Sequence, residues 1–192
     1  MRNCRSSIAR LAGVMLLVGP VWAAAAPDLA PAPLDPAPPG TRVIWVNKDT
    51  SVNYSITVKP SDGEPIRWET EIGEDGEGFF FCLYCADKPY VVDKYSEIWP
   101  LEVGKEVKFN RRYQRGRWGN RVTVTGTETL SLPFGDVDTY VIDWYSFQRG
   151  GGWNGSATIW YAPSIGWVVR YEYSDTEDKE ERHEVVEVVP PD

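Results

Sequence analysis

The stretch "SATIWYAPSIGWVVRYEY", residues Ser156–Tyr173, decides the fold because it contains two β-type runs on either side of an "APSIG" turn sequence. Successive side chains of a strand point to opposite faces of a sheet. In the second run this places an aromatic and apolar set on one face, namely Trp167, Val169, Tyr171 and Tyr173. The other face receives Val168, Arg170 and Glu172. This division predicts a β-hairpin with one side packed on a core.

The same two-residue period continues through the rest of the chain from Thr41 onward. About ten runs rich in Val, Ile, Thr and aromatic residues are separated by Gly, Pro, Asn or Asp. After Pro27 no stretch sustains a helical apolar pattern over three turns, although Tyr90–Ile98 could hold one helical turn. We therefore predict an all-β fold of about ten strands with little helix, as a curved antiparallel sheet, an open barrel or a sandwich.

The N-terminal residues 1–25 have the pattern of a signal peptide. Three arginines precede the apolar run "LAGVMLLVGPVW", and small residues follow for cleavage near Ala23 to Ala25. The run is shorter than the roughly 20 residues that a membrane-spanning helix needs, although an uncleaved anchor is the alternative. Cys4 precedes this run and so does not fit the cysteine that is lipidated in bacterial lipoproteins. We expect a bacterial protein of the periplasm or a secreted protein, with no transmembrane helix in the mature chain.

The residues after the signal peptide divide into a spacer and one domain. Residues 26–40 are rich in proline, which fixes φ and lacks a backbone donor, so we expect an extended spacer there. Residues 41–192 are long enough for a single β domain with its own core. Without residues 1–25 the chain has 17 Lys and Arg against 28 Asp and Glu, a net charge of −11. This balance disfavours nucleic acid and anionic membranes as general partners.

The cysteines and the histidine suggest no metal site and no cofactor. Cys82 and Cys85 form "CLYC", and an exported location favours a disulfide between them over a redox or metal role. A disulfide at this spacing requires the chain to bend there. His183 begins "HEVVE", which lacks the second histidine of a metalloprotease motif. We therefore expect His183 to be a solvated residue at the start of a strand.

The sequence assigns no catalytic residue. No G-x-S-x-G motif supplies a nucleophile for the single histidine. The pairs Asp136 with Asp138 and Glu69 with Glu71 could serve a glycoside hydrolase only if two carboxyl groups faced each other about 5–10 Å apart. A carboxylate-based hydrolase is therefore retained as an unfavoured alternative.

A basic cluster and two tryptophans are the candidate binding residues. The cluster is Arg111, Arg112, Arg115 and Arg117, next to Trp118 in "RRYQRGRWG". Its guanidinium groups could bind lipid headgroups, acidic glycans or a partner protein, whereas the simpler interpretation is a polar hairpin tip. Trp118 and Trp153 lie in Gly-rich turns and are expected to be exposed.

The other aromatic residues are expected to form the core. Trp45, Trp68, Trp144, Trp160 and Trp167 each lie in a predicted strand with correct alternation. A concave sheet face lined with aromatic rings could also enclose a ligand. The candidates for core or cavity wall are Trp144, Trp160, Trp167 and Tyr171.

Three segments, taken together, resemble a family of uncharacterised exported bacterial proteins with a domain of unknown function. They are "WPLEVGKEVKF", "VTVTGTETLSLPFGDVDTYVI" and "TIWYAPSIGWVVRYEY", and the resemblance covers about residues 98–173. The family pattern has a "PL-x-VGK" strand, a "VPAGTFDTY" hairpin and a late "WYAP-x-x-G-x-VVR" hairpin. Phe134–Asp138 departs from the pattern and matches it only at Gly135 and Asp138, besides the preceding Pro133. The resemblance implies a β-rich exported domain and transfers no catalytic residue.

From these observations we expect a monomeric, non-enzymatic binding or cell-envelope-associated protein. Its ligand would be a small apolar molecule or a glycan held on the aromatic-lined concave face of the sheet. The alternative is a structural or interaction protein that docks a protein partner through an edge strand or through the hairpin tip at residues 111–118.

Overall fold

The computed structural model describes residues 26–61, 66–78, 94–113 and 116–192. Within them, ten strands form one antiparallel sheet. The N-terminal strands are β1 (Arg42–Asn47), β2 (Asn53–Lys59), β3 (Ile66–Thr70) and β4 (Asp75–Gly78). The others are β5 (Glu106–Tyr113), β6 (Gly116–Leu132), β7 (Gly135–Arg149), β8 (Asn154–Ala162), β9 (Trp167–Asp175) and β10 (Glu180–Val189).

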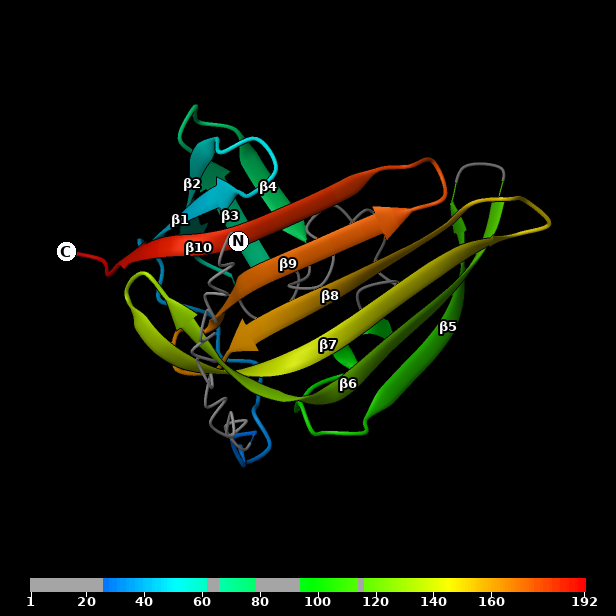
Figure 1. The fold of residues 1–192 in the computed structure, drawn as a ribbon, viewed down its shortest axis with the longest axis horizontal. Helices are drawn as coiled ribbons and strands as arrows, with labels where there is room; N and C mark the ends of the chain where they lie inside the picture. Colours follow the sequence, from blue (N-terminus) through cyan, green and yellow to red (C-terminus); the bar gives the residue numbers. More distant parts are fainter. Residues whose placement is uncertain (1–25, 62–65, 79–93, 114–115) are drawn as a thin grey trace, which may run out of the picture.

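The strand order is β4-β3-β2-β1-β10-β9-β8-β7-β6-β5, so the sheet is open and its ends are β4 and β5. All neighbours except β1 and β10 are consecutive in the chain, and β10 returns to pair with β1. The sheet is strongly curved, and β2–β4 lie at a steep angle to the long strands β6–β10 (Figure 1). The prediction of an all-β curved antiparallel sheet with little helix is confirmed.

The hairpin that decided the prediction is formed by β8 and β9. Ile159 lies opposite Tyr171, and Trp160 lies opposite Arg170. The register shifts between Trp160 and Tyr161, so both residues are buried although they are adjacent in the chain. This bulge is the local departure from the simple alternation that the sequence predicts.

The core lies on the concave side of the sheet. It includes Val124, Ile142 and Ile159, which are register partners on three neighbouring strands and are fully buried. A short helical turn at residues 94–96 and the chain that follows it supply Tyr95, Ile98 and Leu101 to this core. The helical turn lies within the part of Tyr90–Ile98 where the sequence allows one.

The Pro-rich segment differs from the expected spacer because it packs against the domain. Ala32 and Ala37 are buried in the core. The backbone of Ala32 exchanges two hydrogen bonds with Leu101, at 3.0 and 2.7 Å, and the Ala37 amide donates to the Gly166 carbonyl at 2.9 Å. The segment lacks many backbone donors, yet its carbonyls accept hydrogen bonds from side chains of the sheet. The Tyr140 hydroxyl donates to the Ala30 carbonyl at 2.7 Å. We call residues 27–40 the N-terminal strap.

Candidate functional site

The predicted basic cluster is divided between the two faces of the sheet. Arg111 lies opposite Trp118, on the face that carries the core residue Phe109. Arg112 lies opposite Arg117, on the other, convex face. The division follows from strand geometry, because β5 continues to Tyr113 and β6 begins at Gly116, so these residues belong to strands and not to a turn. Arg115 lies outside the described residues, as do Cys82 and Cys85.

Trp118 and Trp153 are not exposed as expected. Both are half-buried, and their ring centroids lie 4.9 Å apart in an edge-to-face arrangement. Trp153 also packs against the core. Gly155 provides space for this arrangement, because a Cβ atom there would lie 2.8 Å from the Trp153 ring and 3.0 Å from the Tyr173 hydroxyl. The two tryptophans and Tyr173 therefore gather on the concave side near one end of the sheet.

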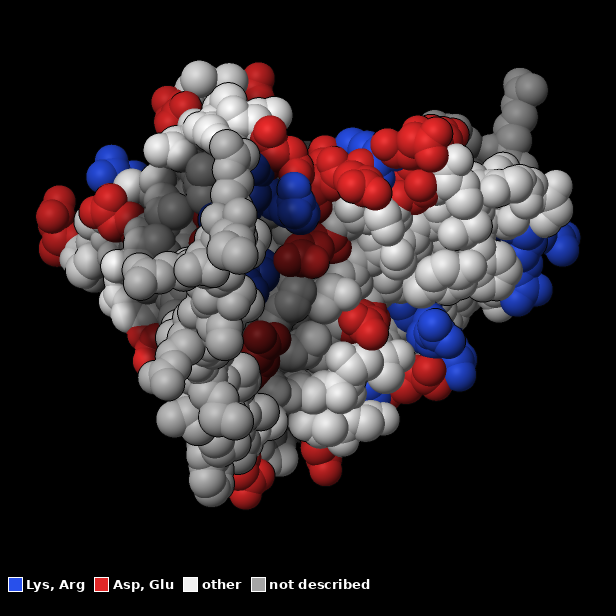
Figure 2. Space-filling view, viewed as in Figure 1, with Lys and Arg blue, Asp and Glu red and all other residues white. Residues whose placement is uncertain are grey.

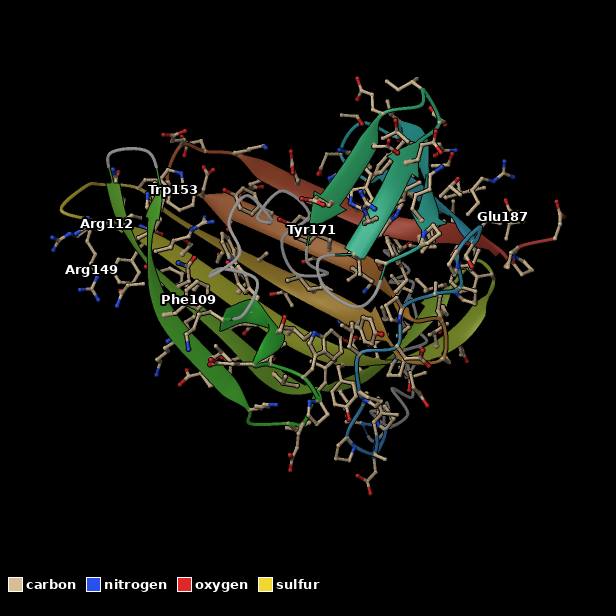
Figure 3. The ribbon with its side chains drawn as sticks, turned by 180° about the vertical axis from the view of Figure 1, so that it is seen from behind. Phe109, Arg112, Arg149, Trp153, Tyr171 and Glu187 are labelled. Carbon is tan, nitrogen blue, oxygen red and sulfur yellow. The ribbon has the colours of Figure 1, made fainter. Side chains whose placement is uncertain are left out.

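The four predicted core or cavity-wall residues have different environments. Trp144 and Trp167 are buried, and the Trp144 indole donates to the Tyr95 hydroxyl at 3.0 Å. Tyr171 is half-buried on the concave side and stacks on Tyr173, with ring centroids 6.4 Å apart. In Figure 3, Trp153 and Tyr171 are seen on this side of the sheet.

The sequence predicts Trp160 as core or cavity wall; it is buried in the core cluster, but it lies on the convex face. Its indole donates to Glu128 Oε2 at 2.7 Å, and the Arg170 guanidinium lies 5.5 Å from its ring centroid. Arg170 in turn donates twice to Glu184 Oε2, at 3.1 and 2.7 Å. Trp160 is therefore covered by charged side chains and cannot line a concave cavity.

Sequence reasoning missed two polar residues of the concave face, Asn120 and Ser146. They lie directly opposite each other on β6 and β7, with exposed fractions of 4% and 0%. Among the residues that the structure describes, neither the Asn120 amide group nor the Ser146 hydroxyl has a hydrogen-bond partner, and the same is true of the nearby Trp118 Nε1. Buried polar groups are nearly always paired, so three adjacent unpaired side chains need an explanation.

We call Trp118, Asn120, Ser146, Trp153 and Tyr173 the concave polar-aromatic site. Asn120, Ser146 and Gly155 are register partners in one row, and Tyr173 lies in the next row. The Tyr173 hydroxyl donates to Asp175 Oδ2 at 2.8 Å. Burial, together with this hydrogen bond, raises the pKa of Tyr173, which therefore stays a neutral hydroxyl. The site thus offers two indoles, a phenol, an amide and a hydroxyl, all uncharged. The sequence signal that could have identified Asn120 is its spacing: residues two apart on a strand share a face, so Asn120 lies on the same face as Val122 and Val124.

His183 is not a solvated residue at a strand start. It lies within β10, is half-buried, and its Nδ1 is 3.0 Å from the Tyr54 hydroxyl. Burial lowers the pKa of His183, while the carboxylates of Glu181 and Asp49 act in the opposite direction. Among the residues described, no group of three or more His, Cys, Asp or Glu side chains is placed to bind a metal ion.

The carboxylate pairs considered for hydrolysis bind neighbouring side chains. Asp136 accepts a hydrogen bond from Ser131, and Asp138 accepts one from Thr129. Glu69 pairs with Lys59, and Glu71 accepts from Ser55.

Two hollows near Arg182 have volumes of about 250 and 290 Å³, and Glu172 also lines both. A third, of about 560 Å³, lies at the opposite end of the sheet, where Trp68 covers Gly76 among charged residues. Of the concave polar-aromatic site, only Tyr173 lines one of these three hollows, the one of about 250 Å³.

No helix in the described part of the chain is long and apolar enough to cross a membrane. Neither a protein-family profile nor a curated protein sequence matches the chain.

Solved structures resemble it in fold. The hypothetical lipoprotein YmcC from Escherichia coli superposes with a TM-score of 0.51 at 11% identity, covering 80% of this chain and 86% of that one. A candidate lipoprotein from Parabacteroides distasonis gives a TM-score of 0.47 at 15% identity, covering 84% of this chain and 100% of that one. An exported protein with a YmcC-like fold from Bacteroides fragilis gives 0.42 at 13% identity, covering 82% and 99%.

Proposed function

We propose that this chain is an exported, non-enzymatic binding protein whose ligand lies on the concave polar-aromatic site. The observation that carries the proposal is the set of three adjacent side chains with buried, unpaired polar atoms: Trp118, Asn120 and Ser146. An unpaired buried donor or acceptor costs about 1–3 kcal/mol. A protein keeps such groups where something outside the chain completes their hydrogen bonds.

The chemistry of the site favours a neutral ligand that carries both hydroxyl groups and apolar faces. Indole and phenol rings stack on apolar faces, while the Asn120 amide can donate and accept, and the Ser146 hydroxyl can do both. The five side chains of the site are uncharged, and the charged groups next to them are Arg111, opposite Trp118, and Asp175, which accepts from Tyr173. A neutral oligosaccharide has this combination, and it fits the unpaired polar atoms better than a purely apolar molecule would. The half-buried Trp118–Trp153 pair lies beside these atoms and would contact the same ligand.

An exported location agrees with the predicted signal peptide and with the names of the proteins that share this type of fold. The fold comparison itself supports the architecture only. The proposal also keeps the resemblance to exported proteins with a domain of unknown function, which is carried by residues 98–173.

The first test is mass spectrometry of the full chain, expressed in a bacterial periplasm and purified without detergent. Extra mass that is present under native conditions and lost on denaturation would identify a retained ligand. The denatured mass also tests the predicted Cys82–Cys85 disulfide, because a bridge removes about two daltons from the reduced value.

The second test measures binding of neutral oligosaccharides, maltohexaose and chitohexaose, by tryptophan fluorescence. We expect Asn120→Ala and Ser146→Ala to weaken binding at least fivefold, since each removes one hydrogen bond of about 1 kcal/mol. The matched control is Ser156→Ala, because Ser156 is exposed and bonds Ser174 on the other side of the sheet. Absence of both a retained mass and oligosaccharide binding would contradict the proposal, as would equal losses in the three variants.

A further inference from the structure

Three arginines form a row across the convex face of the sheet. Arg112 on β5 lies directly opposite Arg117 on β6, which lies directly opposite Arg149 on β7. Neighbouring strands are about 4.8 Å apart, so the three side chains leave the sheet close together. All three are exposed, and Arg112 and Arg149 project from the same end of the sheet (Figure 3). Sequence spacing alone does not reveal this row, because Arg149 is far from the other two in the chain.

The pair Arg117–Arg149 within this row is electrostatically costly in the isolated protein. Like charges directly opposite each other on neighbouring strands are destabilising. Within the part of the chain that the structure describes, no carboxylate forms an ion pair with Arg117 or Arg149. The whole sequence has 28 acidic residues against 20 basic ones, so acidic partners would have been easy to supply. The arrangement therefore points to a negatively charged partner outside the chain.

Two aromatic rings lie on the same face, next to the row. Phe147 rests on Gly119, where an added Cβ would lie 2.4 Å from its ring, and Phe147 stacks on Tyr145 with centroids 5.8 Å apart. The Arg121 guanidinium lies 5.6 Å from the Tyr145 ring centroid. Arg121 is also the register partner of Lys108, which forms an ion pair with Glu106 on the same face. We define the basic face as five cations and two aromatic rings on the convex side of the sheet. They are Lys108, Arg112, Arg117, Arg121, Arg149, Tyr145 and Phe147.

We propose that the basic face binds the surface of a membrane that contains anionic phospholipids. Guanidinium groups bind phosphate in two-pronged geometry. Tyrosine rings such as that of Tyr145 are favoured at the level of lipid headgroups.

The shape of the basic face also fits an extended partner. Its cations lie in separate rows over three strands and do not converge on one point, which suits a planar array of phosphates better than a single anion. None of the hollows described above is lined by a residue of the basic face.

The charge of the remaining surface supports one orientation of the protein on such a membrane. Figure 2 shows basic side chains gathered at the end of the sheet formed by β5–β7, and acidic side chains gathered towards the β9–β10 turn. An anionic membrane repels the acidic part and attracts the basic end, within about one Debye length of roughly 10 Å. The net negative charge of the chain disfavours binding to anionic membranes in general, whereas the local positive charge of the basic face favours it.

The test is co-sedimentation of the full chain, purified without detergent, with vesicles of phosphatidylglycerol and phosphatidylcholine. Each basic side chain near an anionic surface strengthens binding by roughly fivefold. The triple variant R112Q/R117Q/R149Q should therefore bind about 100-fold more weakly than the unaltered protein. Pure phosphatidylcholine vesicles should not bind, and binding should fall as salt rises. R112K/R117K/R149K, which keeps the charge, should retain most of the binding.

The matched control is R42Q/R67Q/K94Q, which removes the same charge from exposed positions on other elements. We expect it to bind like the unaltered protein. Equal losses in the two glutamine triple variants would overturn the proposal, because they would show a response to net charge alone. Binding to soluble polyphosphate without binding to anionic vesicles would also overturn it, as would equal binding to neutral vesicles.

Discussion

Asn120 and Ser146 face each other across β6 and β7; both are buried, and in the described part of the chain neither side chain has a hydrogen-bond partner. Adjacent register partners with complementary groups would normally bond to each other. Here each remains available, and the proposed ligand site rests on that fact.

The first prediction concerns the stability of the free protein. Ser146→Ala should raise the free energy of unfolding by about 1 kcal/mol, because it removes a buried hydroxyl whose desolvation is not compensated. Urea unfolding of the ligand-free protein measures this, with Ser156→Ala as the control that should change little. A variant that is more stable and binds oligosaccharide less well would show that the site sacrifices stability for binding. A clear loss of stability would instead indicate that the hydroxyl has a structural partner.

The second prediction tests the contact between the N-terminal strap and the β8–β9 turn. Gly166 has a φ of +72°, and a Cβ there would lie 2.4 Å from the Asp35 carbonyl oxygen. Gly166→Ala should lower the free energy of unfolding by about 2–4 kcal/mol, since it adds displacement of the strap to backbone strain of about 1–2 kcal/mol. Gly104→Ala is the matched control, with a φ of +90° and no atom near the added Cβ. If both variants lose the same stability in thermal unfolding, the strap contact contributes nothing.

The third prediction concerns Glu184, which holds Arg170 over Trp160. Burial alone would raise the pKa of Glu184, but hydrogen bonds from Arg170 and Lys48 outweigh burial and lower it. A carboxyl with a lowered folded-state pKa adds stability above its unfolded pKa of about 4.5, and loses it as the pH falls through the folded value. Glu184→Gln should therefore destabilise the protein by about 1–2 kcal/mol at pH 7. The difference should shrink below pH of about 4.5.

Urea unfolding across pH measures the Glu184 effect, and Glu187→Gln is the control, because Glu187 is exposed on the same strand. A difference between Glu184→Gln and the unaltered protein that does not change with pH would show that the ion pair is not its cause.

The fourth prediction concerns His183, whose pKa is lowered chiefly by burial. Protonation then favours the unfolded chain, so stability is full above the unfolded pKa of about 6.5 and decreases as the pH falls below it. His183→Gln should lose less stability than the unaltered protein between about pH 7 and pH 5. Parallel pH dependence of the two proteins in urea unfolding would contradict the assignment.

The alternation of side chains explains both the success and the limits of the sequence prediction. It separates Tyr171 from Arg170 and correctly predicts a curved antiparallel sheet, although the register shift at Trp160–Tyr161 interrupts the alternation between Arg170 and Trp167. It also places Asn120 with Val122, although the sequence alone does not show which polar inward residues remain unpaired. The row Arg112–Arg117–Arg149 depends on the pairing register of three strands, and register is not readable from a single basic cluster. The position of Trp160 follows from alternation, yet its cover by Arg170 and Glu128 requires contacts distant in sequence.

The N-terminal strap has a consequence for the order in which the chain folds. Its hydrogen-bond partners lie far along the sequence: the Tyr161 hydroxyl, which donates to the Asp35 carbonyl, is 126 residues away. Contacts of such long separation form slowly, because the chain between them must first be ordered. Residues 27–40, although they precede the sheet in the chain, should therefore be among the last to reach their native position. Until then, the end of the sheet that Ala32 and Ala37 cover remains open to solvent.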